Sequence, residues 1–276
     1  MIVSGRLAQA VAELRAAGVD SAARDARLLI ARAMGVETGR LTLFLQDDLD
    51  PVAGSVFDDM IRQRCNRVPV SHLIGERAFY GRVFEVSGDV LDPRPETETL
   101  VGAALASPFE RVLDLGTGSG CILLTVLAET EATTGQGVDL SPRALEVAAR
   151  NAEALGLGDR VDFATGDWFA PVSGRFDLIL SNPPYIALRE MEGLAPELAH
   201  EPRMALTDEG DGLSAYRIIA AGAGAHLTPR GRLMVEIGPT QGAEVAAMFE
   251  GAGFAEVAIL PDLDGRDRVV CGRWSG

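Results

Sequence analysis

Apolar side chains recur at every third or fourth position through about the first 70 residues, a spacing that predicts amphipathic helices. The pattern divides into a helix that ends at Gly18, one that ends at Gly35, a short one capped by Thr38, and one that begins at Pro51. Four short helices of this kind form a small bundle. Residues 1–73 are therefore expected to be a helical domain.

The pattern changes to alternation over residues 74–92, which are expected to link two domains. Phe79 and Phe84 lie on either side of a Gly81-Arg82 pair, and this arrangement predicts a β-hairpin.

From Arg111 onward, short apolar runs alternate with longer helical patterns. The runs predict seven strands: one at residues 112–115, one that ends at Asp139, and others at 161–163, 176–180, 232–237, 255–260 and 267–273. Repeated alternation of strand and helix predicts a mostly parallel, doubly wound sheet. We expect a single α/β domain over residues 93–276.

Composition places the chain among globular proteins, because 47% of its 276 residues are hydrophobic. No apolar run approaches the roughly 20 residues of a membrane span, and the N-terminus lacks the basic start and apolar stretch of a signal peptide. Cys65, Cys121 and Cys271 are odd in number and widely spaced, and the histidines form no ligand pattern. We expect a cytoplasmic protein with free thiols, no metal and no membrane contact.

The net charge of −15 weighs against a protein that wraps a nucleic-acid backbone, where a basic face is expected. No direct nucleic-acid partner is therefore expected. The helical patterns leave no apolar stripe for a second subunit, so we expect a monomer.

The apolar run at 176–180 leads into Asn-Pro-Pro-Tyr at residues 182–185. Consecutive prolines cannot continue a central strand, because neither has an N–H to give the ladder. The motif is therefore expected on a stiff loop at the carboxyl end of a strand, where open α/β sheets bind ligands. The Asn182 side-chain oxygen and the Pro183 carbonyl offer two acceptors for a planar –NH2 group, and Tyr185 can stack on that group. A proline-rich turn without chemistry is the alternative.

A glycine-rich stretch, Gly116-Thr117-Gly118-Ser119-Gly120, follows the first strand of the α/β domain, with Asp114 just before it. Glycines let a backbone approach a ligand closely, and the start of the next helix presents free N–H groups. The nicotinamide pattern G-x-G-x-x-G needs glycine where this chain has Cys121. A dehydrogenase is therefore disfavoured.

Acidic residues follow the next two strands. Asp139 ends the second strand, where a carboxylate can accept hydrogen bonds from ribose hydroxyls. Asp167 and Trp168 end the third strand, where the indole can lie along a purine ring and the carboxylate can accept from its amino group. The alternatives are that Asp139 caps the helix at Ser141 and that Trp168 belongs to the core.

The order of these features resembles that of the class I S-adenosylmethionine-dependent methyltransferases, which have a Rossmann-like fold. The resemblance implies that the glycine loop backs the methionine part of the cofactor and that S-adenosylhomocysteine is the product. It implies cofactor contacts by Asp114, Gly116, Thr117, Gly118, Ser119, Gly120, Asp139, Asp167, Trp168 and Asn182. Substrate contacts fall to Asn182, Pro183, Pro184 and Tyr185, with Asn182, Pro183 and Tyr185 in catalytic roles. Asn-Pro-Pro-Tyr is shared by subfamilies that methylate adenine N6, guanine N2 or glutamine N5.

Further stretches are similar to the HemK/PrmC family, which methylates N5 of the glutamine in the Gly-Gly-Gln motif of peptide chain release factors. These stretches are Pro93 to Glu98, Gly116 to Gly120, Ser181 to Ile186, Glu236 to Gly238, and Asp262 to Arg268. The resemblance implies that residues 1–73 recognise the substrate and that residues 93–276 are catalytic. Asp92 and His72 depart from the family's pattern, and we expect neither at the site.

Two other functions remain open on the residues. A nucleic-acid base methyltransferase would share Asn-Pro-Pro-Tyr, but the negative charge opposes it. A non-catalytic S-adenosylmethionine-binding protein, or a release-factor chaperone, would not need that motif intact.

Overall fold

The computed structural model describes residues 1–131 and 133–276, which form two compact units. The first comprises Met1–Glu76 with Ala195–His200, and the second comprises Arg77–Leu194 with Glu201–Gly276. The chain thus leaves the second unit after Leu194 and returns at Glu201. In the described part of the chain, no helix is long and apolar enough to cross a membrane.

The first unit is built from short helices around one apolar core. Its α-helices are α1 (Val3–Ala16), α2 (Ala22–Ala33), α3 (Pro51–Cys65) and α4 (Val70–Ile74). Leu14, Leu29, Ile30, Phe57 and Ile61 are fully or almost fully buried in that core. Helix α3 begins with Pro51, as the sequence predicts, and the Asp50 carboxylate caps it by accepting from Val52 N and Ala53 N.

The third helical segment differs from its prediction. Thr38–Phe44 is a 3-10 helix, and its capping position belongs to Glu37 rather than to Thr38. Side chains three residues apart share a face in a 3-10 helix as well as in an α-helix, so the spacing of Leu41 and Phe44 fits both. Helix α4 was not predicted because five residues are too few to display a helical period.

Ion pairs attach residues 195–200 to the helices of the first unit. Arg64 contacts Asp25 at 2.8 Å and Glu197 at 3.0 Å, and Arg67 contacts Glu197 at 2.8 Å. The Arg64 and Asp25 side chains are both buried, so removing Arg64 would leave the Asp25 carboxylate as an uncompensated buried charge. A distant segment of the chain thereby becomes part of this unit.

The second unit contains a seven-stranded mixed sheet in the order β5-β4-β3-β6-β7-β9-β8. The strands are β3 (Arg111–Leu115), β4 (Thr134–Asp139), β5 (Val161–Thr165), β6 (Phe176–Ser181), β7 (Leu227–Glu236), β8 (Phe254–Pro261) and β9 (Asp267–Trp274). The pairs from β5 to β7 are parallel, and β9 runs antiparallel to both of its neighbours. The predicted mostly parallel sheet of seven strands is confirmed.

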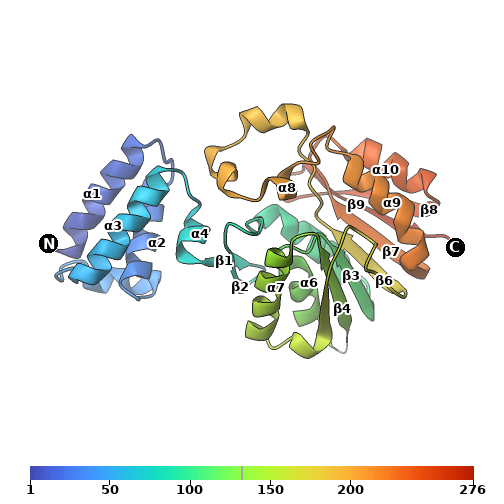
Figure 1. Cartoon of the computed structure of the whole chain (residues 1–276), viewed down its shortest axis with the longest axis horizontal. Coiled ribbons are helices and arrows are strands. Elements are labelled where there is room, and N and C mark those ends of the chain that lie inside the picture. The colour runs from blue at the N-terminus through green and yellow to red at the C-terminus, as the bar shows by residue number, and fades with distance from the viewer. Residues whose placement is uncertain (132) are drawn as a thin grey trace. The chain divides into compact units, whose positions relative to one another are not determined.

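Helices cover both faces of the sheet (Figure 1). Helices α6 (Cys121–Ala128) and α7 (Pro142–Ala154) lie on one side, and α9 (Ser214–His226) and α10 (Gly242–Gly251) lie on the other. Helix α5 (Glu98–Leu105) shares the apolar core of α6. Each face of the sheet has its own apolar core. Leu178 and Leu180 belong to the core that includes α5 and α6, whereas Ile179 between them belongs to the core that includes α9 and α10. This alternation is the two-residue period of a strand buried on both faces. A short helix, α8 (Arg203–Leu206), precedes α9.

A two-stranded hairpin precedes the sheet. It consists of β1 (Glu76–Phe79) and β2 (Arg82–Glu85). Phe79 and Phe84 are buried and meet edge to face, with ring centroids 6.1 Å apart. Both rings belong to the same apolar core as α5 and α6.

The parallel register brings four strand ends to one edge of the sheet. Leu115 pairs with Val138 on one side and Ser181 on the other, and Asp139 pairs with Thr165. Strand β3 lies between β4 and β6. The chain continues from β3 to β4 and β5 on one flank and then crosses over to β6 on the other flank. Such a switch point is where open α/β sheets bind ligands.

Candidate active site

A cavity opens at this edge of the sheet, with an empty volume of about 1050 Å³ that includes its open mouth. Nine of the residues proposed for the site line it: Gly116, Thr117, Gly118, Ser119, Asp139, Asp167, Trp168, Asn182 and Pro184. Asp114, Gly120, Pro183 and Tyr185 lie outside its wall.

The glycine loop uses its glycines in two ways. Gly116 and Gly118 have φ values of 71° and 56°, and a Cβ on either would meet nothing within 4 Å. Glycine is favoured at these two positions by the backbone conformation and not by crowding, so the space beside them is open to a ligand. A Cβ on Gly120 would instead lie 2.9 Å from Leu124 Cδ1 and 3.3 Å from Ala148 Cβ. Gly120 thus permits the close packing of α6 against α7.

Asp139 ties the glycine loop to the start of α7. One carboxylate oxygen accepts from Gly118 N at 2.9 Å, and the other accepts from Ser141 N at 2.9 Å. Burial raises the pKa of this carboxyl, while the N–H donors oppose that rise. Each carboxylate oxygen has a second lone pair, so both remain able to accept from hydroxyl groups in the cavity.

Asp114 supports the loop from behind. It is fully buried and accepts from Thr117 Oγ1 at 2.7 Å. Burial raises the pKa of Asp114 to about 7, against the effect of the Thr117 hydrogen bond. Thr117 itself lines the cavity, so Asp114 acts through a neighbour.

Trp168 and Leu140 give part of the cavity wall an apolar surface. Trp168 lines it with a φ of 46°, an uncommon value for a large side chain. Leu140 also lines it and is 57% exposed. Sequence reasoning missed Leu140, although an apolar residue directly after the strand-ending Asp139 is a signal that could have found it.

Asn182 presents an unpaired oxygen at the wall of the cavity. Its Oδ1 atom is buried and has no hydrogen-bond partner in the part of the chain that the structure describes. Its Nδ2 atom donates to Thr97 Oγ1 at 3.4 Å. Because buried polar atoms are almost always paired, this oxygen is suited to accept from a bound molecule.

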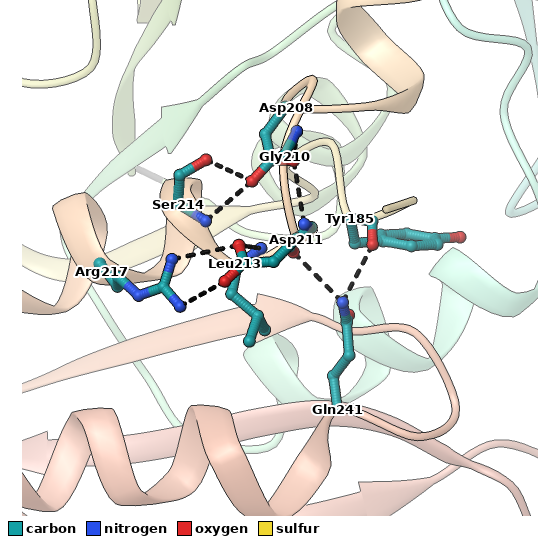
Figure 2. A network of polar contacts seen from close by, with 9 residues as sticks. Tyr185, Asp208, Gly210, Asp211, Leu213, Ser214, Arg217 and Gln241 are labelled. Carbon is teal, nitrogen blue, oxygen red and sulfur yellow. Dashed lines mark hydrogen bonds and ion pairs between the residues drawn. The ribbon is translucent and has the colours of Figure 1, made fainter. Parts of the chain in front are cut away.

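Tyr185 has a different setting. Its side chain packs against the apolar core formed with α9 and α10, and burial raises its pKa to about 12. The main-chain carbonyl of Tyr185 accepts from Gln241 Nε2 at 2.9 Å, and the same nitrogen donates to Gly212 O at 3.2 Å. Figure 2 shows Gln241 reaching toward Tyr185. The motif is therefore fixed from behind.

The turn before α9 is held by a second set of contacts (Figure 2). Asp208 accepts from Gly210 N, Gly212 N and Ser214 N, each at 2.9 Å, and from the Ser214 hydroxyl. Partial burial raises the pKa of Asp208, but these donors outweigh it and lower the pKa to about 2. The ionised carboxylate thus fixes the turn on which Gly212 lies.

The residues just before α5 also belong to the site, although the sequence analysis gave none of them a role of its own. Arg94 and Thr97 line the cavity. Arg94 Nη2 contacts Glu201 Oε1 at 2.5 Å. The expectation that Asp92 lies away from the site is wrong, because Asp92 is buried in the cavity wall and its Oδ1 atom has no partner among the described residues.

Comparison with known proteins identifies relatives across the whole chain. Residues 6–75 match the model of the PrmC N-terminal domain, and residues 87–213 match the methyltransferase small domain. A release factor glutamine methyltransferase of Cereibacter sphaeroides is 57% identical over 99% of both chains, and one of Rhodospirillum rubrum is 45% identical over 99% of this chain and 85% of its own.

A solved structure shares the fold. The crystal structure of a methyltransferase from Pyrococcus furiosus covers 72% of this chain and 92% of its own, with a TM-score of 0.55 at 18% identity. At that identity the likeness concerns the fold alone. The full-length relatives establish that the chain belongs to the release factor glutamine methyltransferase family.

Proposed function

We propose that this protein transfers a methyl group from S-adenosylmethionine to the side-chain amide nitrogen, N5, of the glutamine in the Gly-Gly-Gln motif of peptide chain release factors. The observation that carries the proposal is the buried Oδ1 atom of Asn182 at the cavity wall, which has no hydrogen-bond partner among the residues that the structure describes. An acceptor in that position suits a substrate that donates an N–H group. The relatives named as release factor glutamine methyltransferases supply the substrate class.

The residues of the cavity fit S-adenosylmethionine. The open space beside Gly116 and Gly118 suits the methionine part, and the Asp139 carboxylate suits the ribose hydroxyls. Leu140 and Trp168 provide apolar surface for the adenine ring. When bound, S-adenosylmethionine supplies an electrophilic methyl group on a positively charged sulfur. No metal has a role in this proposal.

The task of the protein is to orient a weak nucleophile. An amide nitrogen is poorly reactive because its lone pair is delocalised into the carbonyl. Asn182 Oδ1 and the Pro183 carbonyl accept the two amide hydrogens, which fixes the nitrogen and stabilises the positive charge that develops on it. The bond between the methyl group and sulfur breaks as the new N–C bond forms, which leaves S-adenosylhomocysteine, and one amide proton passes to water. Tyr185 packs the glutamine side chain.

The negative charge favours a protein substrate over a nucleic acid. The chain carries a net charge of −15, and a nucleic-acid backbone requires basic partners. We further propose that the helical unit recognises the release factor, that the protein acts as a monomer, and that it works in the cytoplasm, where release factors act.

Labelled methyl transfer tests this function. The protein is incubated with methyl-labelled S-adenosylmethionine and a purified release factor, in parallel with the same factor whose Gly-Gly-Gln glutamine is replaced by glutamate, and with ribosomal RNA and DNA. Label on the unaltered factor alone is the expected result. Label on a nucleic acid, or equal label on the glutamate variant, would contradict it.

A further inference from the structure

Three residues from distant parts of the sequence form a chain of side-chain contacts beside the cavity. Asn182 Nδ2 donates to Thr97 Oγ1 at 3.4 Å, and the Thr97 side chain lies close enough to the Glu236 carboxylate for its hydroxyl to lower the pKa of that carboxyl. Asn182 follows β6, Thr97 ends the 3-10 turn Pro95–Thr97, and Glu236 ends β7. Asn182 and Thr97 line the cavity, and Glu236 lies behind them.

Burial makes these contacts consequential. Thr97 is 2% exposed and Glu236 is 1% exposed, so bulk water does not replace their partners. In the described part of the chain, Glu236 Oε2 and Asn182 Oδ1 both lack a hydrogen-bond partner. The Thr97 hydroxyl is therefore the group through which Glu236 reaches Asn182.

The Thr97 hydroxyl determines which end of the Asn182 amide can bond to it. Thr97 has one proton to donate and lone pairs with which to accept. When that proton goes to an ionised Glu236, the oxygen of Thr97 accepts, and only the NH2 end of the Asn182 amide can satisfy it. The amide oxygen of Asn182 is then the end left free for the substrate.

We propose that Glu236 and Thr97 are positioning residues that fix the Asn182 amide with its oxygen free to accept from the substrate. This proposal rests on the proposed function, in which Asn182 Oδ1 accepts a glutamine amide hydrogen. Protonated Glu236 donates to Thr97 instead, which frees the Thr97 proton for Asn182 Oδ1. The flipped amide would then present its NH2 group to the substrate's NH2 group, and the two donors would oppose each other.

The setting of Glu236 places this change in an accessible pH range. Burial raises its pKa to about 7, against the Thr97 hydrogen bond and the positive charge of Arg268. The other titratable or charged groups that face Glu236 are Arg94, Glu96, Cys121, Tyr185 and Tyr216. Because the ionised form orients Asn182, turnover is expected to rise as pH rises through this pKa.

The test compares Thr97→Val with Thr97→Ser. Serine keeps the hydroxyl, whereas valine keeps the shape without it. Thr97→Val is expected to lower kcat for a release factor by about tenfold, the value of one hydrogen bond. Thr97→Ser is expected to stay within a few-fold of wild type, and both variants are expected to keep their affinity for S-adenosylmethionine and their Tm. In Glu236→Gln, kcat is expected no longer to rise with pH around pH 7.

A second measurement needs no substrate. The side-chain amide resonances of Asn182, assigned by their loss in Asn182→Ala, are followed by NMR across pH. They are expected to shift with the ionisation of Glu236 in wild type and Thr97→Ser, but not in Thr97→Val or Glu236→Gln. Static resonances in wild type would overturn the proposal, as would a Thr97→Val enzyme with wild-type kcat and pH profile. Absence of methyl transfer by wild type alongside shifting resonances would count against the proposed function alone.

Discussion

The carbonyl oxygens of Tyr185 and Gly212 accept from the same nitrogen, Nε2 of Gln241, at 2.9 Å and 3.2 Å. Gly212 has a φ of 78°, and a Cβ on it would overlap the Tyr185 carbonyl oxygen. The Asn-Pro-Pro-Tyr loop is therefore supported by a turn that has no room for a larger residue. We expect this support to keep Asn182 in the position that the proposed reaction requires.

Gly212→Ala tests that support. The added methyl must displace the Tyr185 backbone and adopt a left-handed conformation, at a combined cost of about 1–3 kcal/mol. We expect kcat for a release factor to fall at least about tenfold and Tm to fall by several degrees. The matched control is Gly210→Ala on the same turn, because a Cβ there would lie 3.4 Å from Asp208 Oδ1 in ordinary contact. Equal effects of the two variants would contradict the account.

Asn182→Ala removes the acceptor at the cavity wall. We expect turnover to fall by about a hundredfold or more, as for loss of one preorganised polar group. S-adenosylmethionine affinity, measured by calorimetry, is expected to change only a few-fold, and Tm is expected to stay near that of wild type. An Asn182→Ala enzyme with near-normal turnover would remove this residue from the mechanism.

Asp139→Ala removes the carboxylate that braces Gly118 and Ser141 and that we assign to ribose. Hydrogen bonds to charged groups contribute about 1.5–3 kcal/mol, so S-adenosylmethionine affinity is expected to fall about tenfold to a hundredfold. Asp162→Ala, at an exposed position on β5, is the matched control. Unchanged affinity in Asp139→Ala, measured by calorimetry, would show that the ribose assignment is wrong.

Asp114 makes stability depend on pH. Its pKa is raised by burial from 3.8 in the unfolded chain to about 7 in the folded protein. The folded state therefore binds more protons between these values, and stability falls as pH rises from about 4 to about 7. Asp114→Asn removes this effect. By differential scanning fluorimetry without cofactor, its Tm relative to wild type is expected to be several degrees higher near pH 8 than near pH 4.5. The same difference at both pH values would contradict the buried-carboxyl account.

The sequence predicts the fold of the second unit well because its central strands, β3 and β6, are short apolar runs and helical patterns separate most of the strands. The sequence could place the glycine loop, Asp139 and Asn182 at one cavity because each lies at or just after a strand end, and parallel strand ends meet at one edge. The 3-10 helix Thr38–Phe44 was missed because its spacing fits an α-helix as well.

The rest of the site depends on contacts between distant residues. Thr97 and Glu236 meet only because β7 and the turn before α5 pack together, and no spacing in the sequence signals that. The same holds for Glu197, which pairs with Arg64 and Arg67 in the first unit. Asp92 was placed away from the site because an acidic residue in a connecting segment gives no sign of burial.

The most direct test is mass spectrometry of a purified release factor after incubation with this protein and S-adenosylmethionine. Fragmentation of the peptide that carries Gly-Gly-Gln locates any added methyl group. The account predicts one methyl group, placed on the side chain of that glutamine. An unmodified glutamine, from a protein that still binds S-adenosylmethionine, would contradict the proposed substrate while leaving the fold and the cofactor site intact.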